Sequence, residues 1–173
     1  MTIRKILTEP DPFLRQRSND VDEVNNEIRK LMDDMLETMY AAPGIGLAAI
    51  QVGVPKRIIV IDLSKEEEKN PLYFVNPKLT LRSNNNATYE EGCLSVPGQF
   101  AEIDRPDQCH INYLDYKGRQ QELKAEGLLA TCIQHEMDHL EGILFIDYLS
   151  KLKKSFIVKK LSKNKKILER IVV

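Results

Sequence analysis

Two histidines and a glutamate have the spacing of a site that binds a metal ion and activates water. His135 and His139 are four residues apart, and Glu136 directly follows the first of them. On an α-helix, positions i and i+4 lie on one face about one turn apart, so both imidazoles can reach one ion. Glu136 then lies beside the ion, where it can bind a metal-bound water. Such short motifs also arise by chance on amphipathic helices, but this one predicts a hydrolytic metal centre.

A catalytic site of this kind needs a third protein ligand and one open coordination position. The candidates are several carboxylates and Cys93, Cys109, Cys132 and His110. Cys109 follows an alternating apolar pattern and is interpreted as a core residue, whereas Cys132 is expected to pack beneath the ligands. Cys93 follows a glycine in a segment interpreted as a loop, where the backbone can approach a partner closely. Spacing alone favours Cys93 over Cys132 as the third metal ligand, and only modestly.

Composition limits the other functions that the chain could have. Its 173 residues predict one domain with a real core, and 42% apolar with 29% charged residues is ordinary for a globular protein. A net charge of −1 indicates neither a DNA nor a membrane partner. Three cysteines cannot all pair within the chain, and the N-terminus lacks a signal-like apolar run. We therefore expect a cytoplasmic protein.

Three stretches have the apolar period of a helix. The first covers residues 22–42 and ends at Pro43-Gly44. The second covers residues 128–140, which places the histidine motif on a buried helix. The third runs through residues 149–161.

The middle of the chain is predicted to be rich in β-strands. Strands are expected at residues 57–63 and 72–75, with polar loops at 66–70 and 83–86. Residues 109–113 and 121–125 are predicted to form a hairpin. The predicted class is α+β, with antiparallel or mixed sheets wrapped around a central HExxH helix, and with an N-terminal and a C-terminal helix.

Three motifs together resemble the signatures of the peptide deformylase family, in the order of that family. They are Gly44-Ile45-Gly46-Leu47-Ala48-Ala49-Ile50-Gln51, Glu91-Gly92-Cys93-Leu94-Ser95 and His135-Glu136-Met137-Asp138-His139. The resemblance runs from Ile3 to about Leu152. It implies an enzyme that removes the N-formyl group from the formylmethionine of newly synthesised proteins and releases formate.

The resemblance also implies the roles of individual residues. Cys93 joins His135 and His139 as a metal ligand, while Gln51 and the backbone N–H of Leu94 form the oxyanion hole. A metal-bound water attacks the formyl carbon, with Glu136 as general base and then general acid. Arg105 and Asp138 match family positions that support the ligands. The family implies one divalent ion, natively Fe²⁺, with Zn²⁺, Ni²⁺ or Co²⁺ as substitutes, and a monomeric enzyme.

For the substrate, the resemblance implies an extended N-formylmethionyl peptide lying along Gly44 and Gly46. The pocket for its first side chain maps onto Ile45, Tyr89, Leu128, Thr131 and Cys132. Three positions depart from the family pattern. Many relatives have an aliphatic residue at Tyr89 and a branched apolar one at Thr131, and a number have arginine at Phe100. These departures leave the preference for substrates and inhibitors open.

Two other functions compete with this one. Zinc peptidases of the HExxH class usually take a third ligand from downstream of the helix, where this chain has no histidine and Glu141 is too close to serve easily. A non-catalytic protein with a structural Cys/His₂ metal site would need a fourth ligand, for which Cys132 is available. Such a structural site would have no use for Glu136 beside the ion or for the glycine-rich segment.

The C-terminal segment differs from the rest of the chain in charge. We interpret residues 1–150 as the catalytic domain and 151–173 as its basic helical extension. The extension has a single acid, Glu169, and nine of the chain's 25 basic residues: Lys151, Lys153, Lys154, Lys159, Lys160, Lys163, Lys165, Lys166 and Arg170. Some relatives bind the ribosome through a C-terminal helix, so this segment is a candidate contact for ribosomal RNA, although a solvated end explains it nearly as well.

Overall fold

The computed structural model describes residues 2–64 and 68–171, and side chains through residue 164. Part of the predicted loop at 66–70, and the side chains of Lys165, Lys166 and Arg170, lie outside the described residues. The helices are α1 (Asn26–Ala41), α2 (Gly127–Leu140) and α3 (Lys151–Ile171). Short 3₁₀ turns cover Pro12–Arg15, Ala49–Val52 and Phe145–Tyr148. No helix in the described part of the chain has the length and apolar character of a membrane span.

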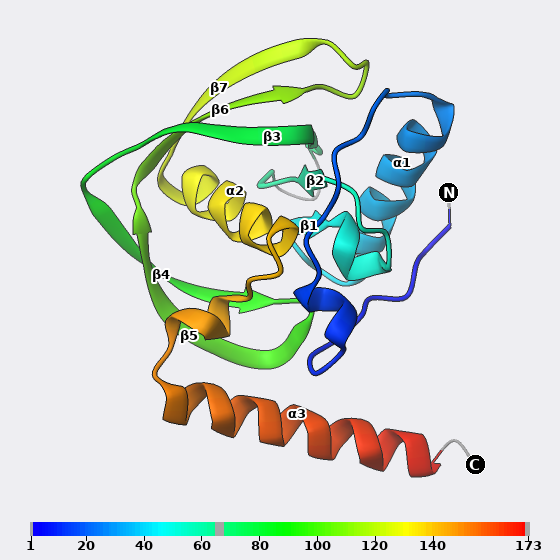
Figure 1. Cartoon of the computed structure of the whole chain (residues 1–173), viewed down its shortest axis with the longest axis vertical. Coiled ribbons are helices and arrows are strands. Elements are labelled where there is room, and N and C mark those ends of the chain that lie inside the picture. The colour runs from blue at the N-terminus through cyan, green and yellow to red at the C-terminus, as the bar shows by residue number, and fades with distance from the viewer. Residues whose placement is uncertain (1, 65–67, 172–173) are drawn as a thin grey trace.

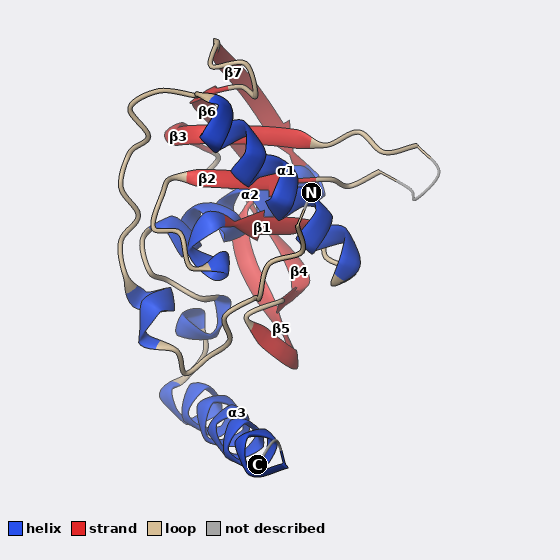
Figure 2. Cartoon of the chain, turned by 90° about the vertical axis from the view of Figure 1, so that its right-hand side faces the viewer, coloured by secondary structure: helices blue, strands red, loops and turns tan. Residues whose placement is uncertain are grey.

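Two antiparallel sheets surround the histidine helix. The larger has the order β1-β2-β3-β6-β7, with β1 (Gly46–Ala48), β2 (Ile58–Ile61), β3 (Leu72–Arg82), β6 (Gln108–Leu114) and β7 (Gln120–Glu126). The smaller pairs β4 (Asn86–Cys93) with β5 (Val96–Pro106). Helix α2 lies between them, as Figure 1 shows, and Figure 2 shows α3 beyond the smaller sheet. The predicted α+β fold with strands around a central helix is confirmed.

Several predicted boundaries were wrong, for local reasons. Helix α1 begins at Asn26 because the Asn25 side chain caps it, accepting a hydrogen bond from the Ile28 amide. Strand β3 does not stop before Asn76 but continues past Pro77 through a bulge between Val75 and Lys78. A proline is tolerated at a bulge because no ladder hydrogen bond from its nitrogen is needed there. The predicted hairpin of residues 109–113 and 121–125 is confirmed as β6 and β7.

The sequence did not predict strands β4 and β5. Glu91-Gly92-Cys93 was interpreted as a loop, but these residues end β4. The β4–β5 register runs from Asn86 opposite Pro106 to Cys93 opposite Val96. The alternation that marks a half-buried strand is hidden in the sequence because the charged residues Glu91 and Arg105 occupy buried positions, whereas Phe100 is exposed. Long-range pairing therefore makes a strand here where local propensity does not indicate one.

The last helix is partly buried against the smaller sheet. Ile157 and Leu161 of α3 belong to a cluster of buried residues that includes Val96 and Ile103 of β5 and Phe145. The helix begins at Lys151, two residues later than predicted, because the preceding residues form the Phe145–Tyr148 turn. Part of its apolar face therefore belongs to the protein core, whereas Leu152 and Phe156 are 82% and 69% exposed.

A buried carboxylate on α1 makes the stability of this fold depend on pH. Asp34 accepts a hydrogen bond from the Thr2 amide and forms ion pairs with Arg4 and Lys30 at 3.1 and 2.9 Å. Burial opposes ionisation, but these partners lower the pKa of Asp34 to about 2. A carboxyl group with a depressed pKa stabilises the fold above its unfolded pKa of about 3.9, and this contribution is lost as pH falls through the folded pKa.

Replacing Asp34 with Asn should therefore lower the free energy of unfolding at pH 7 because it removes the charge. The difference from the wild type should shrink as pH falls from about 5 towards about 2. Urea unfolding at several pH values measures it. A difference independent of pH would show that the charge of Asp34 contributes nothing.

Candidate metal centre and substrate cleft

The histidine motif lies on the buried face of α2. His135, Glu136 and His139 are at most 8% exposed, and Cys93 ends strand β4 beside them. The sulfur of Cys93 and one ring nitrogen of each histidine all lie within 4.8 Å of one another. The Cys93 sulfur is 3.3 Å from His139 Nε2. A thiol and two imidazoles form a donor set that suits zinc, iron, nickel or cobalt.

A hydrogen bond orients one imidazole, and burial keeps the other one neutral. His135 Nδ1 donates to Glu91 Oε2 at 2.8 Å, which leaves Nε2 free to face the ion. Burial opposes ionisation of Glu91, but hydrogen bonds from His135 and Arg105 hold the pKa of Glu91 below its usual value. Burial also lowers the pKa of His139 well below its usual value, so this ring is neutral.

Arg105 links the hydrogen-bonded pair of His135 and Glu91 to the outer surface of α2. Its guanidinium donates to both oxygens of Glu91, at 2.6 and 3.0 Å, and to Asp138 at 2.8 Å. Tyr148 completes the chain by donating to the same Asp138 oxygen at 2.8 Å. The sequence did not single out Glu91 or Tyr148. The signal that could have indicated a role for Glu91 was its position two residues before Cys93. No local signal indicated a role for Tyr148.

Glu136 is placed to exchange a proton beside the metal ligands. Its side chain is 4% exposed, and Oε2 has no hydrogen-bond partner within the described part of the protein. Burial raises the pKa of Glu136 to about 7, a value at which a carboxyl group can both accept and return a proton. This carboxylate fits a metal centre at which water is activated.

The glycine-rich segment packs closely against the same groups. A Cβ atom at Gly46 would lie 2.5 Å from Glu136 Oε1, and one at Gly44 would lie 2.7 Å from a methyl carbon of Leu94. A larger residue at either position would push these side chains away. The glycines therefore allow β1 to border the site closely.

Gln51 brings an amide donor to the metal ligands. Its Oε1 accepts from the Ala48 amide at 2.8 Å, which turns Nε2 towards Ser95 Oγ at 3.0 Å and the Cys93 sulfur at 3.5 Å. Ser95 is fully buried and was not assigned a role from the sequence, although it lies two residues after Cys93.

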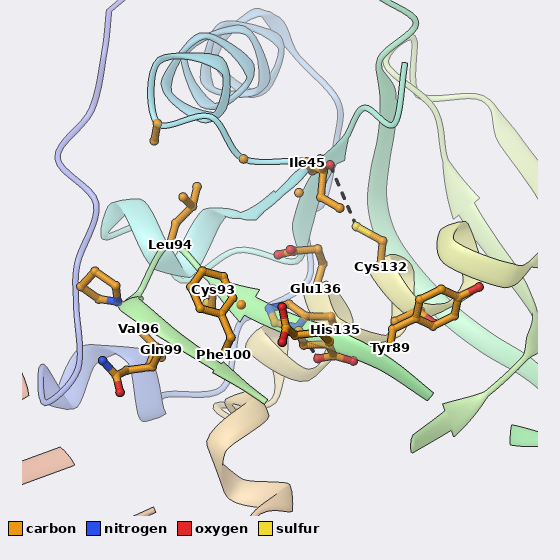
Figure 3. Close-up of a pocket in the computed structure, with 18 of the residues that line it drawn as sticks. Ile45, Tyr89, Cys93, Leu94, Val96, Gln99, Phe100, Cys132, His135 and Glu136 are labelled. Atoms are coloured by element: carbon orange, nitrogen blue, oxygen red, sulfur yellow. Dashed lines mark hydrogen bonds and ion pairs between the residues drawn. The ribbon is translucent and has the colours of Figure 1, made fainter. Parts of the chain in front are cut away.

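A cleft of about 480 Å³ opens over these groups. Twelve of the thirteen residues that the sequence assigned to the site line this cleft, and the exception is His139, which is 1% exposed. The lining residues among them are Gly44, Ile45, Gly46, Gln51, Tyr89, Cys93, Leu94, Leu128, Thr131, Cys132, His135 and Glu136. Figure 3 shows Glu136 and His135 between Cys132 and Cys93. Phe100 is 66% exposed at the rim, where its ring lies against Gly92.

The other candidate ligands lie apart from the metal group. Cys109 is fully buried in the core, as predicted, and His110 belongs to β6. Cys132 faces the Ile45 carbonyl oxygen, and burial raises the pKa of this thiol well above its usual value, so it stays protonated. Glu141 pairs with Arg57 at the end of α2. This arrangement favours neither a downstream carboxylate ligand nor a fourth cysteine ligand.

Comparison with known proteins identifies the family. The profile of the family described as "Polypeptide deformylase" matches residues 3–155. The chain belongs to the polypeptide deformylase family. A peptide deformylase of Pelagibacter ubique is 67% identical over 174 residues and covers 100% of both chains.

Solved peptide deformylases share the fold. The structure from Ehrlichia chaffeensis in complex with actinonin has a TM-score of 0.91 and 47% identity, covering 95% of this chain and 98% of that one. The structure from Legionella pneumophila has a TM-score of 0.90 and 41% identity, covering 98% and 99%. As a polypeptide deformylase, the protein is a metal-dependent hydrolase that removes the formyl group from an N-terminal methionine.

Proposed function

We propose that this deformylase acts with Glu136 as its proton carrier, Cys93, His135 and His139 as its metal ligands, and Gln51 with the Leu94 amide as its oxyanion donors. The observation that carries this assignment is the buried, unpartnered Glu136 oxygen beside the cluster of one cysteine and two histidines. When bound there, a divalent metal supplies Lewis acidity that makes hydroxide available near neutral pH.

Glu136 carries the proton, and Gln51 stabilises the oxygen of the tetrahedral carbon. Glu136 takes a proton from the attacking water and later returns it to the nitrogen of the departing amine, which yields formate and a free α-amine. The Gln51 side chain is held by the Ala48 amide at Oε1 and by Ser95 Oγ at Nε2, and its Nε2 donates to the oxygen of the tetrahedral carbon. Donors aimed in advance at such an oxygen typically lower the barrier by about 2.7–4 kcal/mol.

The substrate peptide extends the larger sheet. Of the described strands only β2 pairs with β1, and the other side of β1 borders the cleft. An extended formylmethionyl peptide can add to such an edge through its main chain. Its first side chain enters the pocket formed by Ile45, Tyr89, Leu128, Thr131 and Cys132.

Formate release from formyl-Met-Ala-Ser tests this assignment against the two rival functions. We expect formate and Met-Ala-Ser as products, and no release of acetate from acetyl-Met-Ala-Ser. Cleavage between the amino acid residues would indicate a peptidase. Full metal content without either reaction would indicate a structural site.

We further propose Fe²⁺ as the native metal, in a monomeric enzyme of the cytoplasm. A single thiolate with two imidazoles binds several ions, and the general affinity order favours Zn²⁺ over Fe²⁺. The ion found after aerobic purification can therefore differ from the native one. Metal analysis of anaerobically prepared protein should find iron, with activity that falls in air and is retained with Ni²⁺.

The basic helix α3 is proposed to hold the enzyme near emerging nascent chains. Lys159, Lys160 and Lys163 are exposed, whereas Lys154 is paired with Asp147 at 2.6 Å. The exposed lysines are available to the phosphates of ribosomal RNA, an attraction that weakens as salt rises. Binding near the exit of the nascent chain would raise the effective substrate concentration. Because Ile157 and Leu161 are buried, residues 151–173 are proposed to be an extension of the catalytic domain.

Changing Lys159, Lys160 and Lys163 to Gln should reduce co-sedimentation with ribosomes at low salt and leave hydrolysis of short formyl peptides intact. Substitution is better than truncation, which would expose the core that Ile157 covers. The matched control changes three exposed lysines on the strands and the β6–β7 turn of the larger sheet, at positions 78, 117 and 124. Equal co-sedimentation of both triple variants would remove α3 from this role.

A further inference from the structure

We infer that the hydroxyl group of Thr131 hydrogen-bonds the sulfur of the substrate's first residue, so that the enzyme distinguishes methionine from sulfur-free side chains of the same shape. This inference rests on the proposed function, because it names a contact made by the formylmethionine that the cleft accepts.

The first observation is a buried polar atom without a partner. Thr131 is 3% exposed and lines the cleft, and its Oγ1 has no hydrogen-bond partner among the described residues. A threonine in a helix often bonds the carbonyl oxygen four residues earlier, which here is that of Gly127, but this hydroxyl does not. Buried polar groups are rarely left unpaired, so an unpaired hydroxyl in a cleft points to a ligand that supplies the missing bond.

The second observation is where this hydroxyl lies. Thr131 is four residues before His135 on α2, so it occupies the same helix face about one turn, or about 5.4 Å, from the metal ligand. That separation is comparable to the reach of a methionine side chain whose formyl group lies at the metal centre.

The surroundings of Thr131 select the kind of side chain that it meets. Its neighbours on the pocket wall include the apolar side chains of Ile45 and Leu128 and the thiol of Cys132, which faces the Ile45 carbonyl oxygen. The phenol oxygen of Tyr89 lies towards Gly127 at the start of α2. The pocket therefore suits a long apolar side chain that carries one weak acceptor, and a thioether is such a group.

No other buried group of the cleft competes for this role. Among the buried side-chain atoms without partners in the described structure, only those of Thr131 and Glu136 belong to the cleft lining. Glu136 serves as the proton carrier. The Thr131 hydroxyl is therefore the buried donor available to the first side chain, while the half-buried phenol of Tyr89 lies towards Gly127.

The test compares formyl-Met-Ala-Ser with formyl-norleucine-Ala-Ser, in which a methylene group replaces the sulfur. The quantity measured is the ratio of kcat/KM for the two peptides within each protein. A single hydrogen bond to a weak acceptor should give the wild type a preference for methionine of about threefold to tenfold. Thr131→Val keeps the shape but removes the hydroxyl, and its ratio should fall to about one. Thr131→Ser keeps the hydroxyl and should retain the preference.

Two further variants make the result specific. Ser18 is also buried with an unpartnered hydroxyl, but it lies outside the cleft lining, so Ser18→Ala should show the wild-type ratio. If valine disturbs the packing, as seen in metal content or thermal unfolding, Thr131→Ala provides the same comparison. Equal ratios in the wild type and the hydroxyl-free variant, with formate released from both peptides, would overturn this inference alone. Absence of formate from both peptides would overturn the proposed function.

Discussion

Replacing Glu136 with Gln should lower kcat for formyl-Met-Ala-Ser by about 10²–10⁴-fold, the usual contribution of a positioned acid–base group. The change preserves the shape of a side chain that is 4% exposed and packed against Gly46. It removes a carboxylate whose Oε2 has no hydrogen-bond partner among the described residues, whereas the nearby Glu91 is held by His135 and Arg105. The amide can still contact the attacking water but cannot take its proton.

Kinetics, metal content and thermal unfolding of the same preparation separate this loss from damage to the site. Metal content and unfolding temperature should match the wild type. The control is Glu126→Gln at the N-terminal end of the same helix, where the Glu126 side chain makes no capping hydrogen bond. If Glu136→Gln stayed within a few-fold of the wild type, another group would have to carry the proton.

Replacing Cys93 with Ser should weaken metal binding by at least about 10–100-fold, the loss seen when even a partner outside the ligand set is removed. A serine hydroxyl stays protonated at neutral pH and is a weaker donor than a thiolate. The sulfur of Cys93 lies 3.3 Å from His139 Nε2 and accepts a hydrogen bond from the Gln51 amide. Among the described residues, Cys93, His135 and His139 form the one group of three such side chains close enough to hold an ion.

Metal content after gel filtration, and competition with a chelator, measure this effect. Cys132→Ser is the matched control, because that thiol lies on the same helix face as the histidines but outside the metal group. It should retain the metal. Full metal content in Cys93→Ser together with metal loss in Cys132→Ser would reverse the ligand assignment.

Part of this site follows from local sequence alone. The spacing of His135 and His139 puts both rings on one helix face, because helix geometry depends only on neighbouring residues. The same short-range physics explains why residues 128–140 and the hairpin of β6 and β7 were predicted close to their observed bounds. The family resemblance settled the choice of Cys93, which the sequence alone favoured only modestly over Cys132, and it added Gln51, which no local period indicates.

Tertiary structure decided what depends on residues far apart in the chain. Cys93 meets His139 across 46 residues only because β4 pairs with β5 and lies against α2. The same packing buries Glu91 against His135 and directs the thiol of Cys132 towards Ile45. It also buries the hydroxyl of Thr131, a residue of the cleft lining, without a hydrogen-bond partner among the described residues. Burial and the satisfaction of polar groups are set by what surrounds a residue in space, and residue spacing along the chain does not contain that information.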